Sequence, residues 1–207
     1  MKKLFAATAL ASLAAIGMAV PSLAAGATAT ATSDLNIRSG PGPQYPPTGV
    51  IGNGSTVAVE GCIQGSQWCQ VDYNGTTGWA YGQYMTMNYQ GRTVVIEQQP
   101  SAVPVVTYQA PAGATAAPTE TVNGELIGRV GDVPPQAIEP PPAPVRTYVV
   151  DHRTDPVYLN GEVVTGAGVP DTVQLQQVPD YSYDYAYVNG QPVLVDPTSR
   201  RIVYVYR

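Results

Sequence analysis

Between residues 35 and 80 the chain is divided into short apolar runs by Gly, Pro and Asn-Gly pairs. The runs predicted to form strands are residues 35–37, 48–51, 56–62, 68–73 and 77–80. The pair Asn74-Gly75 is a strong signal for a two-residue hairpin turn between the last two runs. Short strands at this spacing leave too little area for two packed sheets, so a small closed or half-closed barrel is predicted.

The composition fits a chain of turns and short strands and excludes one class of partner. The 207 residues include 21 Gly and 20 Pro, which both disfavour long helices. Charged residues make up only 12% of the chain, and the formal net charge is -5. Because phosphate binding needs clustered Lys and Arg, a nucleic-acid partner is not expected.

The first 25 residues have the pattern of a cleaved signal peptide. Lys2 and Lys3 precede an uncharged apolar run at residues 4–20, and small residues follow it. We expect cleavage after Ala24 or Ala25, which would give a periplasmic or secreted protein without a membrane span. An uncleaved membrane anchor is the alternative, although the run is short and rich in Ala for a bilayer span.

The chain holds two cysteines, Cys62 and Cys69. An even number of cysteines in an exported chain predicts a disulfide bond. A metal or catalytic pair is the alternative, but this spacing without a nearby His or further Cys is a poor zinc site. We therefore predict a disulfide, no metal site and no cofactor.

Three motifs in the first half of the chain resemble the bacterial SH3 domain. They are DLNIRSGPG at residues 34–42, QWCQV at 67–71 and NGTTGWA at 74–80, and the resemblance covers residues 32–86. It implies an SH3-like barrel, which we place at residues 26–89. Members of that family often bind peptides of the cell wall. The resemblance therefore also implies that the ligand is such a peptide, for example a peptidoglycan stem peptide or cross-bridge.

Strand alternation places Trp68 and Cys69 on opposite faces of one strand. If Cys69 turns inward toward Cys62, Trp68 points outward and is available to a ligand. The residues predicted to form a ligand cleft are Trp68, Tyr45, Tyr81 and Tyr84, with Arg38 at the rim. Such a cleft would hold an extended peptide by aromatic contacts and by a charge-assisted bond to a carboxylate. The alternative is that these rings only close a small barrel, which needs large side chains.

Residues 90–121 are predicted to be a flexible linker rich in Pro, Ala and Thr. Such a composition buries too little apolar surface to offset the entropy of ordering the chain. A strand at residues 93–96 is the one element that this segment could add. Further on, the run Glu139 to Pro144 could be a polyproline ligand, although a spacer is the simpler interpretation.

Residues 122–207 are predicted to form a small C-terminal domain rich in β-hairpins, so the predicted fold class of the chain is all-β. A weak repeat relates residues 123–127 to residues 160–164. The best hairpin joins residues 185–188 to residues 193–195 across Asn189-Gly190, and residues 147–150 are a further strand candidate. The segment 185–203 resembles the end of an uncharacterised domain family of Gram-negative secreted proteins, which implies a location and no chemistry.

Four tyrosines, Tyr181, Tyr183, Tyr185 and Tyr187, would share one face of an extended segment. An aromatic stripe of this kind can stack on sugars or peptides, but it can equally be the half-buried face of a small sheet. The neighbouring residues Asp180 and Asp184 supply only two carboxylates, which are too few ligands for a cation, so no metal is assigned to them.

No enzyme class fits the sequence. The cysteines are explained as a disulfide, the single His152 lies in another region as a turn residue, and no Gly-x-Ser-x-Gly motif is present. The acidic residues are scattered, and no phosphate loop or dinucleotide fingerprint occurs.

We predict a non-enzymatic binding protein of the cell envelope whose SH3-like module recognises peptidoglycan peptide. The alternative is an envelope scaffold that binds protein and has no cell-wall ligand; the sequence does not set the oligomeric state.

Overall fold

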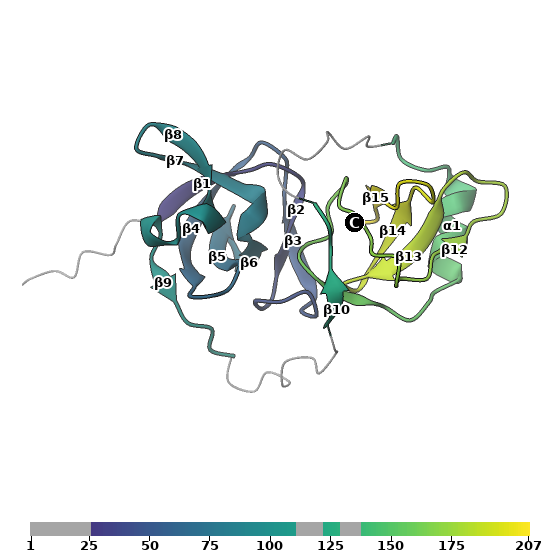
Figure 1. Ribbon diagram of the computed structural model, residues 1–207, viewed down its shortest axis with the longest axis horizontal. Helices are drawn as coiled ribbons and strands as arrows, with labels where there is room; N and C mark the ends of the chain where they lie inside the picture. Colours follow the sequence, from purple (N-terminus) through teal and green to yellow (C-terminus); the bar gives the residue numbers. More distant parts are fainter. Residues whose placement is uncertain (1–25, 111–121, 129–137) are drawn as a thin grey trace, which may run out of the picture.

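The computed structural model describes residues 26–110, 122–128 and 138–207. The predicted signal peptide and residues 111–121 of the predicted linker therefore lie outside the described residues. The described chain forms two parts that lie side by side, one built from the first half of the sequence and one from the second (Figure 1). Both parts are dominated by β-strands, in agreement with the predicted fold class.

The N-terminal part is a strongly bent antiparallel sheet around one core, as expected of an SH3-like barrel. Its strands are β1 (Ala27–Ala31), β2 (Leu35–Arg38), β3 (Pro47–Ile51), β4 (Thr56–Ile63), β5 (Trp68–Tyr73), β6 (Thr76–Tyr81), β7 (Met85–Tyr89) and β8 (Arg92–Val95). They are ordered β3-β2-β6-β5-β4-β1-β7-β8. The short helix η1 (Gly82–Tyr84) joins β6 to β7.

The turn between β5 and β6 is the one that the sequence predicts. Asn74 and Gly75 both have positive φ, 52° and 80°, and the strands pair in register from Tyr73 opposite Thr76 to Trp68 opposite Tyr81. A right-handed strand twist favours this kind of two-residue turn, and Asn-Gly is the pair that adopts it most readily. The hairpin fixes Trp68 and Tyr81 beside each other at its open end.

Residues 90–110 are ordered against the barrel, so the prediction that the linker begins at residue 90 is wrong. This segment contains β8, the turns η2 (Ile96–Gln98) and η3 (Pro100–Ala102), and β9 (Val105–Val106), which pairs in parallel with β4. Ile96 and Val103 are buried, at 1% and 6% exposure. A few apolar side chains among the Pro, Gln and Ser residues thus add to the core of the barrel. The average composition of the segment does not reveal this contribution.

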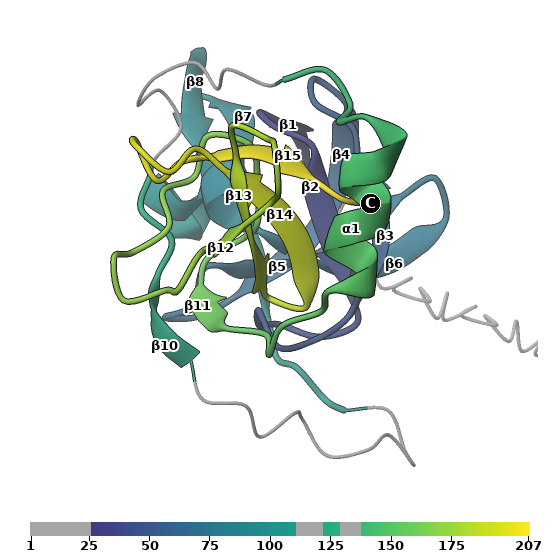
Figure 2. The same ribbon diagram turned by 90° about the vertical axis from the view of Figure 1, so that its right-hand side faces the viewer.

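The C-terminal part is a four-stranded antiparallel sheet covered by one helix. The sheet contains β12 (Gln176–Gln177), β13 (Asp184–Val188), β14 (Gln191–Val195) and β15 (Ile202–Val205), in that order. The predicted hairpin across Asn189-Gly190 is present, with Val188 paired to Gln191. The helix α1 (Ala143–Asp151) lies on the side of this sheet that faces away from the N-terminal part (Figures 1 and 2).

The strand predicted at residues 147–150 is wrong, because these residues belong to α1. Their β-branched side chains favour a strand locally. However, Pro144 lies in the first helical turn, where a missing N–H costs nothing, and Val145 and Val149 are buried four residues apart on one face. That face packs in a cluster with Tyr185, Tyr187 and other side chains of the sheet.

The two copies of the weak repeat lie next to each other. β10 (Val122–Glu125) pairs in parallel with β11 (Tyr158–Asn160), and the backbone N–H of Leu126 donates to the carbonyl of Asn160 at 2.9 Å. Leu126 and Leu159 belong to the same buried apolar cluster as the core of the barrel. One hydrophobic core therefore continues from the N-terminal part into the C-terminal part.

Candidate functional site

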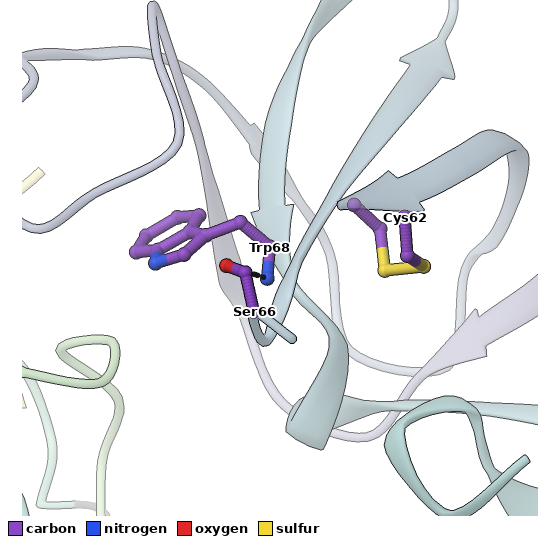
Figure 3. The surroundings of a disulfide bond; sticks show 4 residues. Cys62, Ser66 and Trp68 are labelled. Carbon is purple, nitrogen blue, oxygen red and sulfur yellow. Dashed lines mark hydrogen bonds between the residues drawn. A yellow bond between two sulfur atoms is a disulfide. The ribbon is translucent and has the colours of Figure 1, made fainter. Parts of the chain in front are cut away.

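The predicted cleft residues Trp68, Tyr81 and Tyr84 do lie together. The ring centroids of Trp68 and Tyr81 are 5.3 Å apart, and those of Tyr81 and Tyr84 are 6.1 Å apart. However, all three rings are buried, with Trp68 only 4% exposed. The expectation that Trp68 is available at the surface is therefore wrong, although its side chain does point away from the disulfide (Figure 3).

Carboxylates of the C-terminal part lie close enough to the aromatic cluster to affect it. Burial raises the pKa of Tyr84 to about 12, and the Glu162 carboxylate adds to this shift. Burial also raises the pKa of Tyr81, with a smaller contribution from Glu125. In addition, the amide of Gln83 in η1 donates to the carbonyl of Gly128 at 3.2 Å. The C-terminal part therefore lies against the face of the barrel on which the cleft was predicted.

The ring of Tyr45, the fourth predicted cleft residue, contacts an aromatic side chain that was not predicted to be part of the cleft. The Tyr45 ring contacts Tyr108 edge-on at a centroid distance of 5.7 Å, and Tyr108 contacts Trp79 in the same manner at 5.6 Å. Trp79 is buried, at 6% exposure. Tyr108, from the segment that was predicted to be a linker, thus occupies the position next to Tyr45.

Arg38 does not lie at a rim. It is fully buried, and its guanidinium forms a bidentate ion pair with Glu162. Nε lies 2.5 Å from Oε2, and Nη2 lies 2.6 Å from Oε1. Side-chain exposure is 0% for both residues. The predicted contact between Arg38 and a carboxylate therefore exists, but the carboxylate belongs to the same chain.

Further polar side chains complete this buried site. Asn36 Nδ2 donates to Glu162 Oε1 at 2.9 Å and to Gln191 Oε1 at 2.8 Å. Arg38 Nη1 donates to the carbonyl oxygen of Asn189 at 3.3 Å. Charged groups inside a protein are tolerated when their hydrogen-bonding capacity is satisfied, and every group in this network has a partner.

Sequence reasoning missed Glu162, Asn36, Asn189 and Gln191 as parts of a site. One signal was present, because Asn36 and Arg38 alternate with the apolar Leu35 and Ile37 along β2. That alternation is usual for a strand with one face in water. Here the polar face of β2 meets the C-terminal part, and its partners come from positions more than 120 residues away.

The disulfide between Cys62 and Cys69 is present, as predicted, and joins directly paired positions of β4 and β5.

A pocket of about 360 Å³ lies on the side of the barrel that carries the disulfide. We call it the disulfide pocket; its lining includes the two cysteines, Ile63, Ile96 and Val105, with Gln67 and Glu97 among its polar groups. Gln67 Nε2 donates to Glu97 Oε1 at 2.7 Å. Trp68 and the disulfide lie on opposite sides of β5 (Figure 3), so this pocket is distinct from the predicted cleft.

The tyrosine stripe of the C-terminal part is largely covered by α1. Tyr185 and Tyr187 are buried, and their hydroxyls donate to the carbonyls of His152 at 2.7 Å and Val149 at 3.0 Å. Only Tyr181 and Tyr183 are half-buried at the end of the stripe. His152 itself is exposed at the end of α1 and stacks on Tyr148.

The described ranges contain no group of three or more His, Cys, Asp or Glu side chains that could hold a metal ion. In the same ranges, no helix is both long enough and apolar enough to cross a membrane.

Comparison with known families agrees with this division of the chain. Residues 33–86 match the bacterial SH3 domain, and residues 148–207 match a domain of unknown function, DUF1236. Both matches fall on the segments whose motifs resemble these families. No curated protein and no solved structure matches the chain. The N-terminal part is thus a bacterial SH3 domain, a class of binding module, and it is followed by a DUF1236 region.

Proposed function

We propose that the protein is an exported, non-enzymatic binding protein whose SH3 domain binds the peptide part of the cell wall. The observation that carries this proposal is the disulfide pocket, which is an open pocket on a binding module. Its apolar lining suits an aliphatic side chain, and the Glu97 carboxylate suits an amino group, such as those of peptidoglycan peptides. The aromatic cleft is less suited to an outside ligand, because its rings are buried.

Two features support export. The first 25 residues have the sequence pattern of a signal peptide, and the Cys62–Cys69 disulfide is of the kind that persists in oxidising compartments. Mass spectrometry of the protein isolated from the periplasm or medium should find an N-terminus directly after Ala24 or Ala25. An intact N-terminus on membrane-bound protein would contradict this part of the proposal.

Co-sedimentation with purified sacculi tests the ligand. Wild-type protein should pellet with the sacculi, and Val105→Trp should reduce the pelleted fraction because the indole fills the disulfide pocket. The matched control is Val50→Trp on β3, since Val50 is also an exposed valine, at 37% against 64% for Val105, but does not line the pocket. If the wild type is no more enriched than an unrelated acidic protein, the cell-wall ligand is wrong.

A second candidate function is an envelope scaffold that binds protein rather than cell wall. One observation favours it: the aromatic and Arg38 face of the SH3 domain contacts a protein segment, namely the C-terminal part of this chain. The sedimentation experiment separates the two candidates. A scaffold without a cell-wall ligand stays in the supernatant, and Val105→Trp makes no difference to it.

A further inference from the structure

The Arg38 site is held in shape by the SH3 domain itself. Arg38 Nη1 donates to the backbone carbonyls of Pro43 at 3.1 Å and Tyr45 at 2.7 Å, both in the loop between β2 and β3. These bonds orient the guanidinium so that Nε and Nη2 face the C-terminal part. Asn36, two residues earlier on β2, points its amide toward the same oxygen of Glu162 as Nη2. The domain thus presents three N–H donors to a single carboxylate.

The carboxylate is also presented in a fixed position. Glu162 follows Gly161, whose φ of 107° is strained for other residues, and its Oε1 accepts the backbone N–H of Val163 at 2.8 Å. Asn189 holds this loop from the other side, because its Oδ1 accepts from the N–H of Leu159 and its Nδ2 donates to the carbonyl of Gly161. The hairpin turn of the C-terminal sheet therefore positions the loop that carries Glu162.

A planar guanidinium offers two parallel N–H donors. Among the common acceptor groups of proteins, a carboxylate matches these two donors best. In a fully buried site the match is selective, since a neutral side chain in place of Glu162 would leave the charge of Arg38 without a partner. Apolar side chains of both parts also belong to one buried cluster, which includes Leu126 and Leu159 as well as Trp68 and Tyr81. The combination of an aromatic patch with an arginine is what a peptide-binding cleft needs.

We propose that Arg38 and Asn36, with the neighbouring aromatic cluster, form a carboxylate-recognition site of the SH3 domain, and that its ligand is the Glu162 loop of the same chain. The DUF1236 region is then the bound partner of the SH3 domain. This inference is independent of the proposed cell-wall ligand, because it concerns a different face of the domain.

The test uses the full chain with a site for a sequence-specific protease inserted between residues 110 and 122. After cleavage, the two pieces of the wild type should co-elute in gel filtration, held together by non-covalent contacts alone. Glu162→Gln keeps the size of the side chain but removes its charge, and it should weaken the association by a factor on the order of 100 to 1000. Glu139→Gln is the matched control, because Glu139 is exposed and makes no ion pair with Arg38.

Two results would overturn the proposal. The first is separation of the cleaved wild type, and the second is association of the cleaved Glu162→Gln pieces as tightly as in the wild type. Chemical rescue covers the case in which cleavage unfolds a piece. In the uncleaved Glu162→Ala variant, added formate should raise the melting temperature saturably, beyond the effect of equal chloride and beyond any effect on the wild type. A melting temperature that does not respond to formate also argues against a carboxylate site.

Discussion

The guanidinium of Arg38 and the carboxylate of Glu162 form a completely buried ion pair between residues 124 positions apart in the sequence. Arg38 belongs to the SH3 domain, and Glu162 lies in the DUF1236 region. Loss of either side chain leaves the other charge buried without this partner, so the stability of the chain depends on the pair.

This dependence can be measured with a double-mutant cycle. Arg38→Met and Glu162→Gln should each lower the free energy of unfolding by about 3–5 kcal/mol, because each leaves an uncompensated buried charge or its unsatisfied donors. The double variant should lose clearly less than the sum, since neither charge remains. Denaturant titration with a constant m-value measures all four proteins. Additive losses would mean that the two side chains do not interact in solution.

The disulfide gives a second prediction. Cys62 and Cys69 are seven residues apart, so the closed loop is short and the expected stabilisation is about 2–3 kcal/mol. Replacement of both cysteines by Ser should lower the unfolding free energy by this amount. Thiol labelling of unfolded, unreduced wild type should find no free thiol. Stoichiometric labelling would show that the bond is absent in the protein as isolated.

The sequence predicts those elements whose cause is local. Asn74-Gly75 and Asn189-Gly190 adopt the positive φ angles that two-residue hairpins need, and the residues on each side alternate to match. The cysteine pair is likewise local, since Cys62 and Cys69 meet across neighbouring strands. In these cases a few adjacent residues determine the structure, and they can be identified without knowledge of the rest of the chain.

The sequence fails to predict the features that depend on distant packing. Arg38 is an ordinary surface residue by sequence, and only the position of Glu162 makes it a buried one. The segment 90–110 resembles a linker in composition, yet Ile96 and Val103 bury it against the barrel. Residues 147–150 favour a strand locally, but in the fold Val145 and Val149 form a helical face that packs against apolar side chains of the sheet. Tertiary contacts override the local preference in each case.

Close packing at Gly78 leads to a third prediction. An added Cβ at this position would lie 2.4 Å from Ile37 Cγ2 and 2.7 Å from the carbonyl oxygen of Arg38. Gly78→Ala should therefore force β2 and β6 apart and lower the unfolding free energy by about 1–3 kcal/mol. At Gly52 the nearest atom, Ser55 Oγ, would be 3.3 Å from the added Cβ, so Gly52→Ala is the matched control. It should change stability by less than about 1 kcal/mol. Equal effects of the two substitutions would contradict the close approach of β2 to Gly78.

The buried tyrosines predict how stability changes at alkaline pH. Burial, together with the Glu162 carboxylate, raises the pKa of Tyr84 to about 12, whereas an unfolded tyrosine has a pKa of about 10. Between these values the folded state keeps the phenol proton and the unfolded state releases it. The stabilisation is therefore fully present below pH 10 and is lost as the pH rises toward 12, by about 2–3 kcal/mol in total. Tyr81, whose pKa is also raised, acts in the same direction.

Denaturant titrations at a series of pH values from about 9 to 11.5 test this prediction, with the ionisation of the tyrosines followed by tyrosinate absorbance. The wild type should lose stability across this range, and Tyr84→Phe should show a shallower loss, because Phe has no proton to release. Glu162→Gln should also reduce the slope, because it removes the carboxylate that disfavours the Tyr84 phenolate. A Tyr84→Phe variant whose stability falls as steeply as that of the wild type would mean that Tyr84 is not buried beside Glu162 in solution.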